Sequence, residues 1–146
     1  MSILVKVILA TTGEQKQLAF AVRQEVFVVE QHVSREDEFD QYEEQASHFL
    51  AYAANEPIGA ARWRKTDKGI KLERFAVKKS FRGMGVGSEI LQAVLDDIKA
   101  SSESGQYLYL HAQLPAIPLY EKFGFEKTGP QFEECDILHY KMEMVI

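Results

Sequence analysis

Apolar residues recur with two different periods along this chain of 146 residues, and each period predicts one kind of element. Residues 2–10 alternate between apolar and polar side chains and are rich in β-branched residues, which predicts a strand. Residues 14–29 carry apolar side chains at helical spacing, which predicts an amphipathic helix that either Thr11 or Thr12 caps. The first two predicted elements are therefore a strand and a helix.

Three apolar stretches with short connections occupy the middle of the chain. Residues 47–54, 58–65 and 70–77 each predict a strand. The connecting segments 55–57 and 66–69 are rich in turn-forming residues and are of hairpin length. This part of the chain is therefore predicted to form an antiparallel meander.

The remaining residues predict two helices and three strands. The helix that follows the glycines has the clearest pattern in the chain, because the apolar residues of the segment 87–98 fall on one face. A strand over residues 106–112 follows, then a short helix within 115–124, and then a hairpin within 125–145. The predicted order is β-α-β-β-β-α-β-α-β-β. This order indicates an α/β protein with a mixed, mostly antiparallel sheet flanked by helices on both faces, in a single domain over residues 1–146.

The segment from Glu30 to Gln45 interrupts this regular pattern. It is strongly acidic and shows no periodicity that would form a core, so it predicts a loop or a short helix. A run of charges is most often a solvated surface. We therefore expect this segment to be exposed to water.

Composition and charge narrow the class of protein. Apolar residues make up 46% and charged residues 27% of the chain, as in soluble globular proteins. The net charge of −5 argues against nucleic-acid binding, which needs a basic surface. No apolar run approaches the ~20 residues of a membrane span, and no basic region precedes the N-terminal apolar run as in a signal peptide. The single cysteine, Cys135, excludes an internal disulfide framework and a cysteine zinc cluster. We therefore expect a cytoplasmic protein with no nucleic-acid or membrane partner.

The predicted strand at 70–77 leads through a short basic loop into glycines that open the next helix. Backbone N–H groups at a helix N-terminus bind anions, and glycines let the backbone approach a phosphate closely. The spacing of Gly83, Gly85 and Gly87 does not match the dinucleotide fingerprint. Ser88-Glu89 follows the last glycine, where a Walker loop has Lys-Ser or Lys-Thr. These residues predict a pyrophosphate site, and a turn for close helix–sheet packing is the structural alternative.

The glycine segment fills a third pattern, Arg/Gln-x-x-Gly-x-Gly/Ala, with Arg82, Gly85 and Gly87. This pattern resembles the acetyl-CoA site of the GNAT superfamily of N-acetyltransferases. Three further segments carry the resemblance: LERFAV at 72–77, LHAQ at 110–113 and the A-x-x-L-Y-E-K-x-G-F run at 116–125. Residues 23–31 and 40–48 are similar to a bacterial branch with poorly defined substrates. The resemblance covers nearly the whole chain and implies the GNAT fold.

The resemblance also implies acetyl-CoA as co-substrate. The strand before the glycines would hold the pantetheine arm through Phe75, Ala76 and Val77, with the Val77 N–H near the thioester carbonyl. A donor there would stabilise the oxygen that becomes negative during attack. The implied pyrophosphate site comprises Arg82, Gly83, Met84, Gly85, Val86, Gly87 and Ser88.

For the reaction, the resemblance implies direct transfer of the acetyl group to an amine in a ternary complex. Tyr120 matches the position of the acid that protonates the leaving CoA thiolate, and packing against the sheet is its structural alternative. An alkylammonium acceptor must lose a proton before it attacks. Glu73 is the first candidate for this base, acting directly or through water.

Two alternatives to a catalytic Glu73 stay open. Strand alternation places Leu72, Arg74 and Ala76 on one face and Glu73, Phe75 and Val77 on the other. Glu73 then either faces solvent or pairs with Arg62 or Arg64 of a neighbouring strand. His111, on the next predicted strand, is a rival base because histidine titrates near neutral pH, and a hydrogen-bonded histidine within the sheet is its structural alternative.

The acceptor pocket is predicted between the end of the first helix, the acidic segment and the last hairpin. Arg23 would bind an acceptor carboxylate or phosphate, whereas Glu134 would bind a cation, so the two candidates point to opposite substrates. Phe27 and Gln31 are the other predicted substrate-binding residues. The histidines show no convincing metal-ligand spacing, so no metal is predicted.

The leading hypothesis is N-acetylation of a small-molecule amine or amino sugar with acetyl-CoA. Transfer to a protein or peptide amine is a second enzyme hypothesis, and an acyl-CoA-binding sensor without turnover is the non-enzyme alternative. A nucleotide-binding module is weakened by the glycine spacings. Dimerisation is common for the fold, so a homodimer stays open, although no interface is evident in the sequence.

Overall fold

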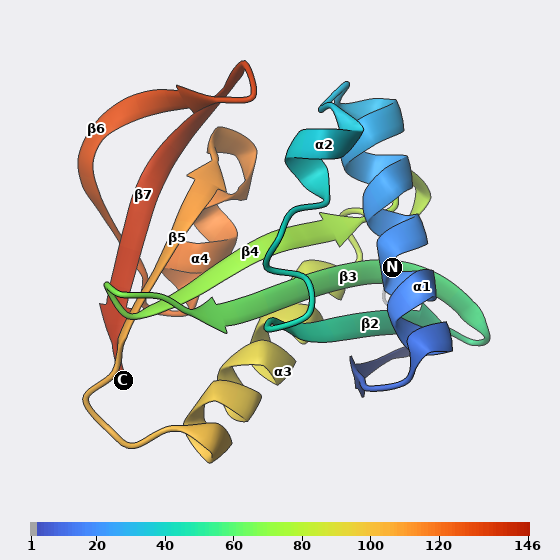
Figure 1. Cartoon of the computed structure of the whole chain (residues 1–146), viewed down its shortest axis with the longest axis horizontal. Helices are drawn as coiled ribbons and strands as arrows, with labels where there is room; N and C mark the ends of the chain where they lie inside the picture. Colours follow the sequence, from blue (N-terminus) through green and yellow to red (C-terminus); the bar gives the residue numbers. More distant parts are fainter. Residues whose placement is uncertain (1–2) are drawn as a thin grey trace.

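The computed structural model describes residues 3–146, which form a mixed α/β fold on a seven-stranded sheet (Figure 1). The strand order is β1-β2-β3-β4-β5-β7-β6, and all neighbouring strands are antiparallel except β4 and β5. The strands are β1 (Val5–Ala10), β2 (Ser47–Ala53), β3 (Glu56–Lys65), β4 (Ile70–Val77), β5 (Tyr107–Gln113), β6 (Glu126–Glu134) and β7 (Ile137–Val145). The predicted mixed, mostly antiparallel sheet is confirmed. Ser2, where the first strand was predicted to start, lies outside the described residues.

Two long helices pack on the sheet, and five shorter helical segments lie in the connections between the longer elements. They are α1 (Gly13–Arg23), the π-helical η1 (Gln24–Glu30), α2 (Arg35–Glu38), η2 (Lys79–Phe81), α3 (Val86–Ser101), η3 (Leu114–Ala116) and α4 (Ile117–Lys122). Thr12, and not Thr11, caps α1, because its hydroxyl accepts the Gln15 N–H while the Gln15 side chain accepts the Thr12 N–H. Within residues 3–146, no helix is long and apolar enough to cross a membrane.

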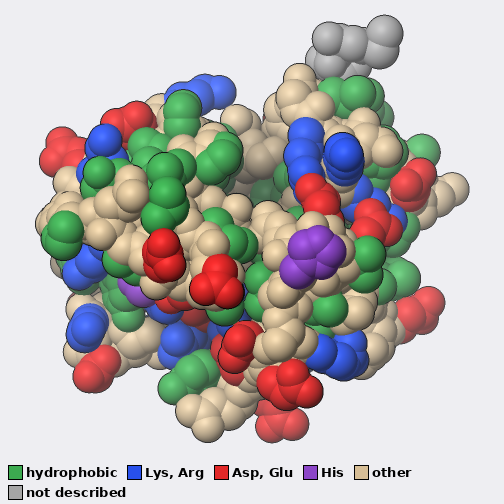
Figure 2. All heavy atoms as spheres, turned by 90° about the horizontal axis from the view of Figure 1, so that it is seen from above, with side chains coloured by type: hydrophobic (Ala, Val, Ile, Leu, Met, Phe, Trp, Pro, Cys, Tyr) green, Lys and Arg blue, Asp and Glu red, His purple; other side chains and the backbone are tan. Residues whose placement is uncertain are grey.

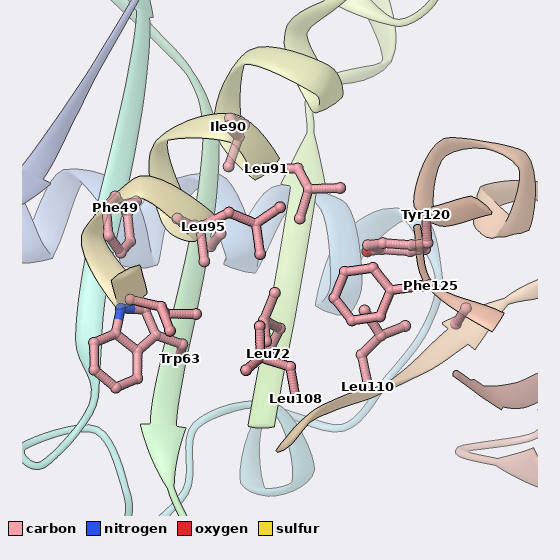
Figure 3. Close-up of a cluster of buried hydrophobic side chains, with 14 of the residues drawn as sticks. Phe49, Trp63, Leu72, Ile90, Leu91, Leu95, Leu108, Leu110, Tyr120 and Phe125 are labelled. Carbon is pink, nitrogen blue, oxygen red and sulfur yellow. The ribbon is translucent and has the colours of Figure 1, made fainter. Parts of the chain in front are cut away.

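Two hydrophobic clusters lie on opposite faces of the sheet, because successive strand residues point to opposite faces. On β2, Phe49 packs in the cluster that includes α3, and Leu50 packs in the cluster that includes α1. The α3 cluster is the larger of the two. Figure 3 shows part of it, with Leu91 of α3 above Leu72 of β4 and with Tyr120 in the same cluster. The sheet is thus fixed between two helical layers, as the sequence predicts.

The β4–β5 pair forms only a short ladder and then opens. Parallel pairing joins Ile70–Leu72 to Leu108–Leu110 and stops there. The next β4 residues enter a bulge: the register with β3 shifts between Ala60 and Arg62, and Arg74 has a φ of 61°. The two strands therefore part at the end of β4 that leads to the glycine segment, and this opening positions the site.

The bulge also overturns the predicted alternation of β4. Phe75 and Val77 pack against the same α3 cluster as Leu72, whereas Ala76 belongs to the α1 cluster. The prediction that Leu72 and Ala76 share a face is therefore wrong. The extra residue at Arg74 shifts every following side chain to the other face, and no periodicity in the sequence marks this position.

The acidic segment is buried to a greater extent than predicted. Glu38 is 3% exposed and accepts a hydrogen bond from Nε of the buried Arg23 at 2.8 Å. Arg62, which is fully buried, contacts Asp40 at 2.7 Å and Glu43 at 2.9 Å. We call Arg23, Glu38, Asp40, Glu43, Arg62 and Glu73 the buried ion-pair network. The expectation of a purely solvated segment is therefore wrong, because its carboxylates compensate two buried guanidinium groups.

Candidate active site

A cavity of about 430 Å³ lies where the end of β4 meets the start of α3. Its walls come from β4, the glycine segment, and the η3–α4 region that contains Ala116, Leu119 and Tyr120. All but one of the residues predicted to bind the cofactor line it: Phe75, Ala76, Val77, Arg82, Gly83, Gly85, Val86, Gly87 and Ser88. Met84 does not line the cavity. We call this space the cofactor cavity.

The glycines give the cofactor cavity an open floor of backbone groups. Gly83 and Gly85 have φ values of 76° and 84°, which are costly for residues with a Cβ. Gly85 precedes α3 as its N-cap, and no side chain caps the first N–H groups of this helix. A Cβ built at Gly83 or Gly85 would meet no atom within 4 Å. Uncapped N–H groups beside open space suit an anionic ligand.

Arg82 lines this cavity but is already paired. Its guanidinium donates to both carboxylate oxygens of Glu30, at 2.5 and 2.6 Å, and its Nε donates to the carbonyl of Val77 at 2.9 Å. The hydrogen bonds between Arg82 and Glu30 raise the pKa of Arg82 and lower the pKa of Glu30. Arg82 thus links the glycine segment to the end of η1.

A second cavity, of about 450 Å³, lies on the other side of Tyr120. It is lined by the end of η1, the acidic segment, β4, β5 and the turn between β6 and β7. Figure 1 shows the β6–β7 turn and α2 on the two sides of this end of the molecule. Phe75, Ala116 and Tyr120 line both cavities. We call the second space the acceptor cavity.

Tyr120 forms part of the wall between the two cavities. It is 6% exposed, and its ring makes an edge-on contact with Phe75 at 5.8 Å between centroids. A second edge-on contact joins it to Phe125 at 6.0 Å (Figure 3). Burial raises the pKa of its hydroxyl above the ordinary value for tyrosine. The phenol therefore stays protonated at neutral pH and is able to donate its proton to an anion that forms beside it.

Glu73 lines the acceptor cavity, but three cations hold its carboxylate. Arg62 and Arg64 contact it at 2.6 and 2.8 Å, and Lys71 at 3.2 Å. Burial alone would raise the pKa of Glu73, but the hydrogen bond from Arg64 and the charges of Arg62 and Lys71 outweigh burial and lower it to about 2. Such a carboxylate is a weak proton acceptor near neutral pH. The geometry thus favours the ion-pair alternative over a catalytic base.

We expect Glu73→Gln to keep the limb of the pH–rate profile in which the rate rises with pH. The substitution removes a carboxylate that already holds its cations, and it leaves the other proton acceptors of the acceptor cavity in place. The measurement is kcat/KM from acidic to basic pH for both proteins. Loss of that limb in the variant alone would return the base to Glu73.

His111 lines the acceptor cavity with one ring nitrogen available. Its Nδ1 lies 3.2 Å from Oε1 of Glu134, and because a carboxylate accepts, Nδ1 carries the hydrogen. Nε2 is then the proton-accepting nitrogen of the neutral ring. The hydrogen bond from His111 is also the main cause that lowers the pKa of Glu134.

The predicted acceptor residues divide into two groups. Phe27, Gln31 and Glu134 all line the acceptor cavity. Arg23 does not: it is 1% exposed, and its guanidinium is held by Glu38 and by Glu43 at 2.7 Å. The prediction that Arg23 binds an acceptor carboxylate or phosphate is therefore wrong, because its charge is compensated inside the fold.

The family model of the acetyltransferase (GNAT) domain matches residues 9–146, which include both cavities. The chain belongs to the GNAT superfamily of N-acetyltransferases. YjcF, an uncharacterized N-acetyltransferase of Bacillus subtilis strain 168, is 40% identical over 139 residues, which cover 94% of this chain and 97% of YjcF. The family assignment made from the glycine pattern is therefore confirmed.

Solved structures show the same GNAT fold. Escherichia coli ElaA superposes with a TM-score of 0.82 at 24% identity, covering 97% of this chain and 98% of ElaA. A GNAT acetyltransferase from Elizabethkingia anophelis with acetyl-CoA bound superposes with a TM-score of 0.68 at 18% identity, covering 97% of this chain and 98% of that one. At these identities the likeness establishes the fold alone.

Sequence reasoning missed some residues of this GNAT site. Gln113 exchanges hydrogen bonds with Gln31 across the acceptor cavity, at 2.9 and 3.3 Å, and Lys71 and Arg74 line the same cavity. Nothing in the sequence around Gln113 indicates that its side chain pairs with Gln31, 82 residues away. In the described part of the chain, no group of three or more His, Cys, Asp or Glu side chains is arranged to hold a metal ion.

Proposed function

We propose that this protein transfers the acetyl group of acetyl-CoA to a primary amine of a small molecule. One observation carries the proposal: a cavity at the uncapped N-terminus of α3 meets a second cavity at Tyr120. The first suits a pyrophosphate and the pantetheine arm that follows it. The acetyl-CoA-bound GNAT structure supports this choice of cofactor.

In the proposed reaction, the thioester lies beside Tyr120 and the amine enters from the acceptor cavity. The acceptor ammonium first gives a proton to Nε2 of His111, through water. The neutral nitrogen then attacks the thioester carbonyl carbon, so that a C–N bond forms and the C–S bond breaks. The leaving thiolate takes the hydroxyl proton of Tyr120, the product nitrogen loses its remaining excess proton to water, and the Tyr120 phenolate regains a proton from water. The Val77 N–H is proposed to stabilise the carbonyl oxygen during the attack.

The size of the acceptor cavity supports a small-molecule acceptor. A volume of about 450 Å³ is within the range of small-molecule sites. Residues of both α2 and the β6–β7 turn line it, so a protein acceptor would need clearance between these two segments. A small amine needs no such clearance.

Thermal unfolding with separate additions of acetyl-CoA, CoA, NAD and ATP tests the cofactor. A ligand at 100 times its Kd that binds only the folded state stabilises by about 2.7 kcal/mol, which gives a measurable rise in Tm. We expect a rise with acetyl-CoA and CoA only. A rise with NAD or ATP alone, or no rise at all, would refute the proposed function. A screen of amines for release of free CoA then tests turnover.

We expect Gly85→Glu to weaken CoA binding on the order of a hundredfold, because a carboxylate beside the pyrophosphate adds like-charge repulsion of several kcal/mol. Gly85→Ala is the matched control. It imposes the same positive φ on a residue with a Cβ, at a cost of about 1–2 kcal/mol, without adding a charge. Calorimetric titration of both variants with CoA separates the two effects. Equal affinities for CoA would mean that the pyrophosphate lies elsewhere.

A further inference from the structure

The acceptor cavity has more negative than positive charge left uncompensated. Its walls include five carboxylates and three cationic side chains, and the buried Arg23 and Arg62, which do not line the cavity, contact three of these carboxylates. Each cation already contacts a carboxylate: Arg64 and Lys71 contact Glu73 at 2.8 and 3.2 Å, and Arg74 contacts Asp40 at 3.1 Å. The guanidinium and ammonium groups that line the cavity are thus all paired with carboxylates. An acceptor carboxylate or phosphate would have to compete with these carboxylates for a cation.

Glu134 lacks a contact with Lys or Arg in the described chain. Its carboxylate oxygens face two histidines, with Oε1 3.2 Å from Nδ1 of His111 and Oε2 3.9 Å from Nε2 of His139. The first contact is a hydrogen bond, and the second is too long to be one. Oε2 therefore keeps its capacity to accept a hydrogen bond from a ligand. Figure 2 looks onto this end of the molecule and shows Asp and Glu side chains across the middle of the face.

His139 provides a second, independent acceptor in the same place. It lines the acceptor cavity, although its side chain is only 8% exposed. Its Nδ1 lies 2.7 Å from the carbonyl oxygen of Ile137, which only accepts, so Nδ1 carries the hydrogen of the neutral ring. Nε2 is then a bare acceptor, and no side chain of the described residues donates to it. A ligand in the cavity that donates a hydrogen bond to Nε2 would satisfy this acceptor.

We propose that Glu134 and His139 form a subsite for an ammonium group, and that the acceptor is an alkyl diamine. An ammonium between Oε2 and Nε2 donates to both atoms, and its charge compensates the Glu134 carboxylate. The inference rests on the proposed function, because it concerns the acceptor of that reaction.

The position of the subsite indicates that it binds a second amine and not the reacting one. The reacting nitrogen must reach the thioester where the two cavities meet, at Phe75, Ala116 and Tyr120. Glu134 and His139 line the acceptor cavity alone. The amine that reacts gives up its charge, while the distal amine keeps its proton and anchors the molecule. A primary monoamine lacks this anchor, and an ω-amino acid places a carboxylate against Glu134.

The experiment measures binding and turnover for acceptors matched in chain length: putrescine, n-butylamine and γ-aminobutyrate, and then cadaverine, n-pentylamine and δ-aminovalerate. Binding is titrated calorimetrically to the protein saturated with CoA, which cannot transfer an acetyl group. We expect a diamine to bind at least about tenfold more tightly than the monoamine and the amino acid of its length, since a charge-assisted hydrogen bond contributes on this scale. Turnover with acetyl-CoA should rank the acceptors in the same order, through KM.

Glu134→Gln should remove the advantage of the diamine and leave CoA affinity unchanged. Glu133→Gln is the matched control, because Glu133 is exposed like Glu134 but does not line the cavity. His139→Phe tests the second acceptor atom, and its aromatic ring is able to keep the stacking on Phe132.

Equal binding of diamine, monoamine and amino acid, or a diamine preference that survives Glu134→Gln, would overturn the diamine proposal. If the protein binds CoA but none of the diamines, the diamine proposal also fails while the proposed cofactor stands; if it does not bind CoA, the proposed function fails first.

Discussion

Replacing Tyr120 with phenylalanine should lower kcat by about 10²- to 10⁴-fold, with little change in the KM for acetyl-CoA. General acid catalysis contributes a factor of this size, and the substitution removes only the proton that the leaving thiolate takes. The packing should survive, because the edge-on contacts with Phe75 and Phe125 involve the ring and not the hydroxyl. Steady-state kinetics with an accepted amine, together with urea unfolding, measure both effects.

Tyr107→Phe is the control for Tyr120→Phe. The Tyr107 hydroxyl donates to Glu143 at 2.7 Å, and neither residue lines the cofactor cavity or the acceptor cavity, so loss of this hydroxyl should leave kcat unchanged. If Tyr120→Phe turns over at the wild-type rate, the proton on the thiolate comes from water or from another group. A fall in kcat that comes with a large loss of stability would instead assign Tyr120 a packing role.

The geometry of the cofactor cavity was predictable because its information is local. The backbone requirement for Gly83 and Gly85, the uncapped helix that follows them and the strand before them all lie within about 20 consecutive residues of the sequence. Short-range patterns of this kind depend on the chain's own geometry, not on a distant partner. The same holds for the Thr12 cap of α1, where the sequence left two candidates and hydrogen bonding selected one.

The acceptor half was less predictable because long-range contacts decide it. Arg23 looked like a ligand for an acid, but its carboxylate partners lie 15 and 20 residues away along the chain. Glu73 was the first candidate for the base, and the sequence left its pairing with Arg62 or Arg64 open; the contacts with both arginines favour the ion pair. The bulge at Arg74 also breaks the period on which the predicted faces of β4 were based. An arginine in the apolar stretch of β3 was a usable signal, since a buried guanidinium requires carboxylates nearby.

Replacing Arg62 with methionine should lower the free energy of unfolding at neutral pH by about 3–5 kcal/mol, the usual effect of removing one partner of a buried ion pair. Arg62 is fully buried and contacts Asp40, Glu43 and Glu73 within 2.9 Å. Without it, these three carboxylates face one another across the vacated position, and Arg74, Arg23 and Arg64 compensate them only in part. Arg35→Met is the control, because Arg35 is exposed and contacts Gln24 and Phe39 outside the network.

The destabilisation caused by Arg62→Met should shrink as the pH falls. Arg62 helps to hold the pKa values of Asp40 and Glu73 at about 2 against the opposing effect of burial. Because these values lie below those of an unfolded chain, near 4, their contribution to stability is full above about pH 5 and is lost as the pH falls towards 2. The variant lacks much of this contribution, so its free energy of unfolding falls less at acidic pH. Glu38, whose pKa is raised by burial, acts in the opposite sense in both proteins. Urea unfolding at several values between about pH 7 and pH 2.5 measures the difference. A difference in stability that is constant over this range would show that Arg62 acts through packing and not through these two carboxylates.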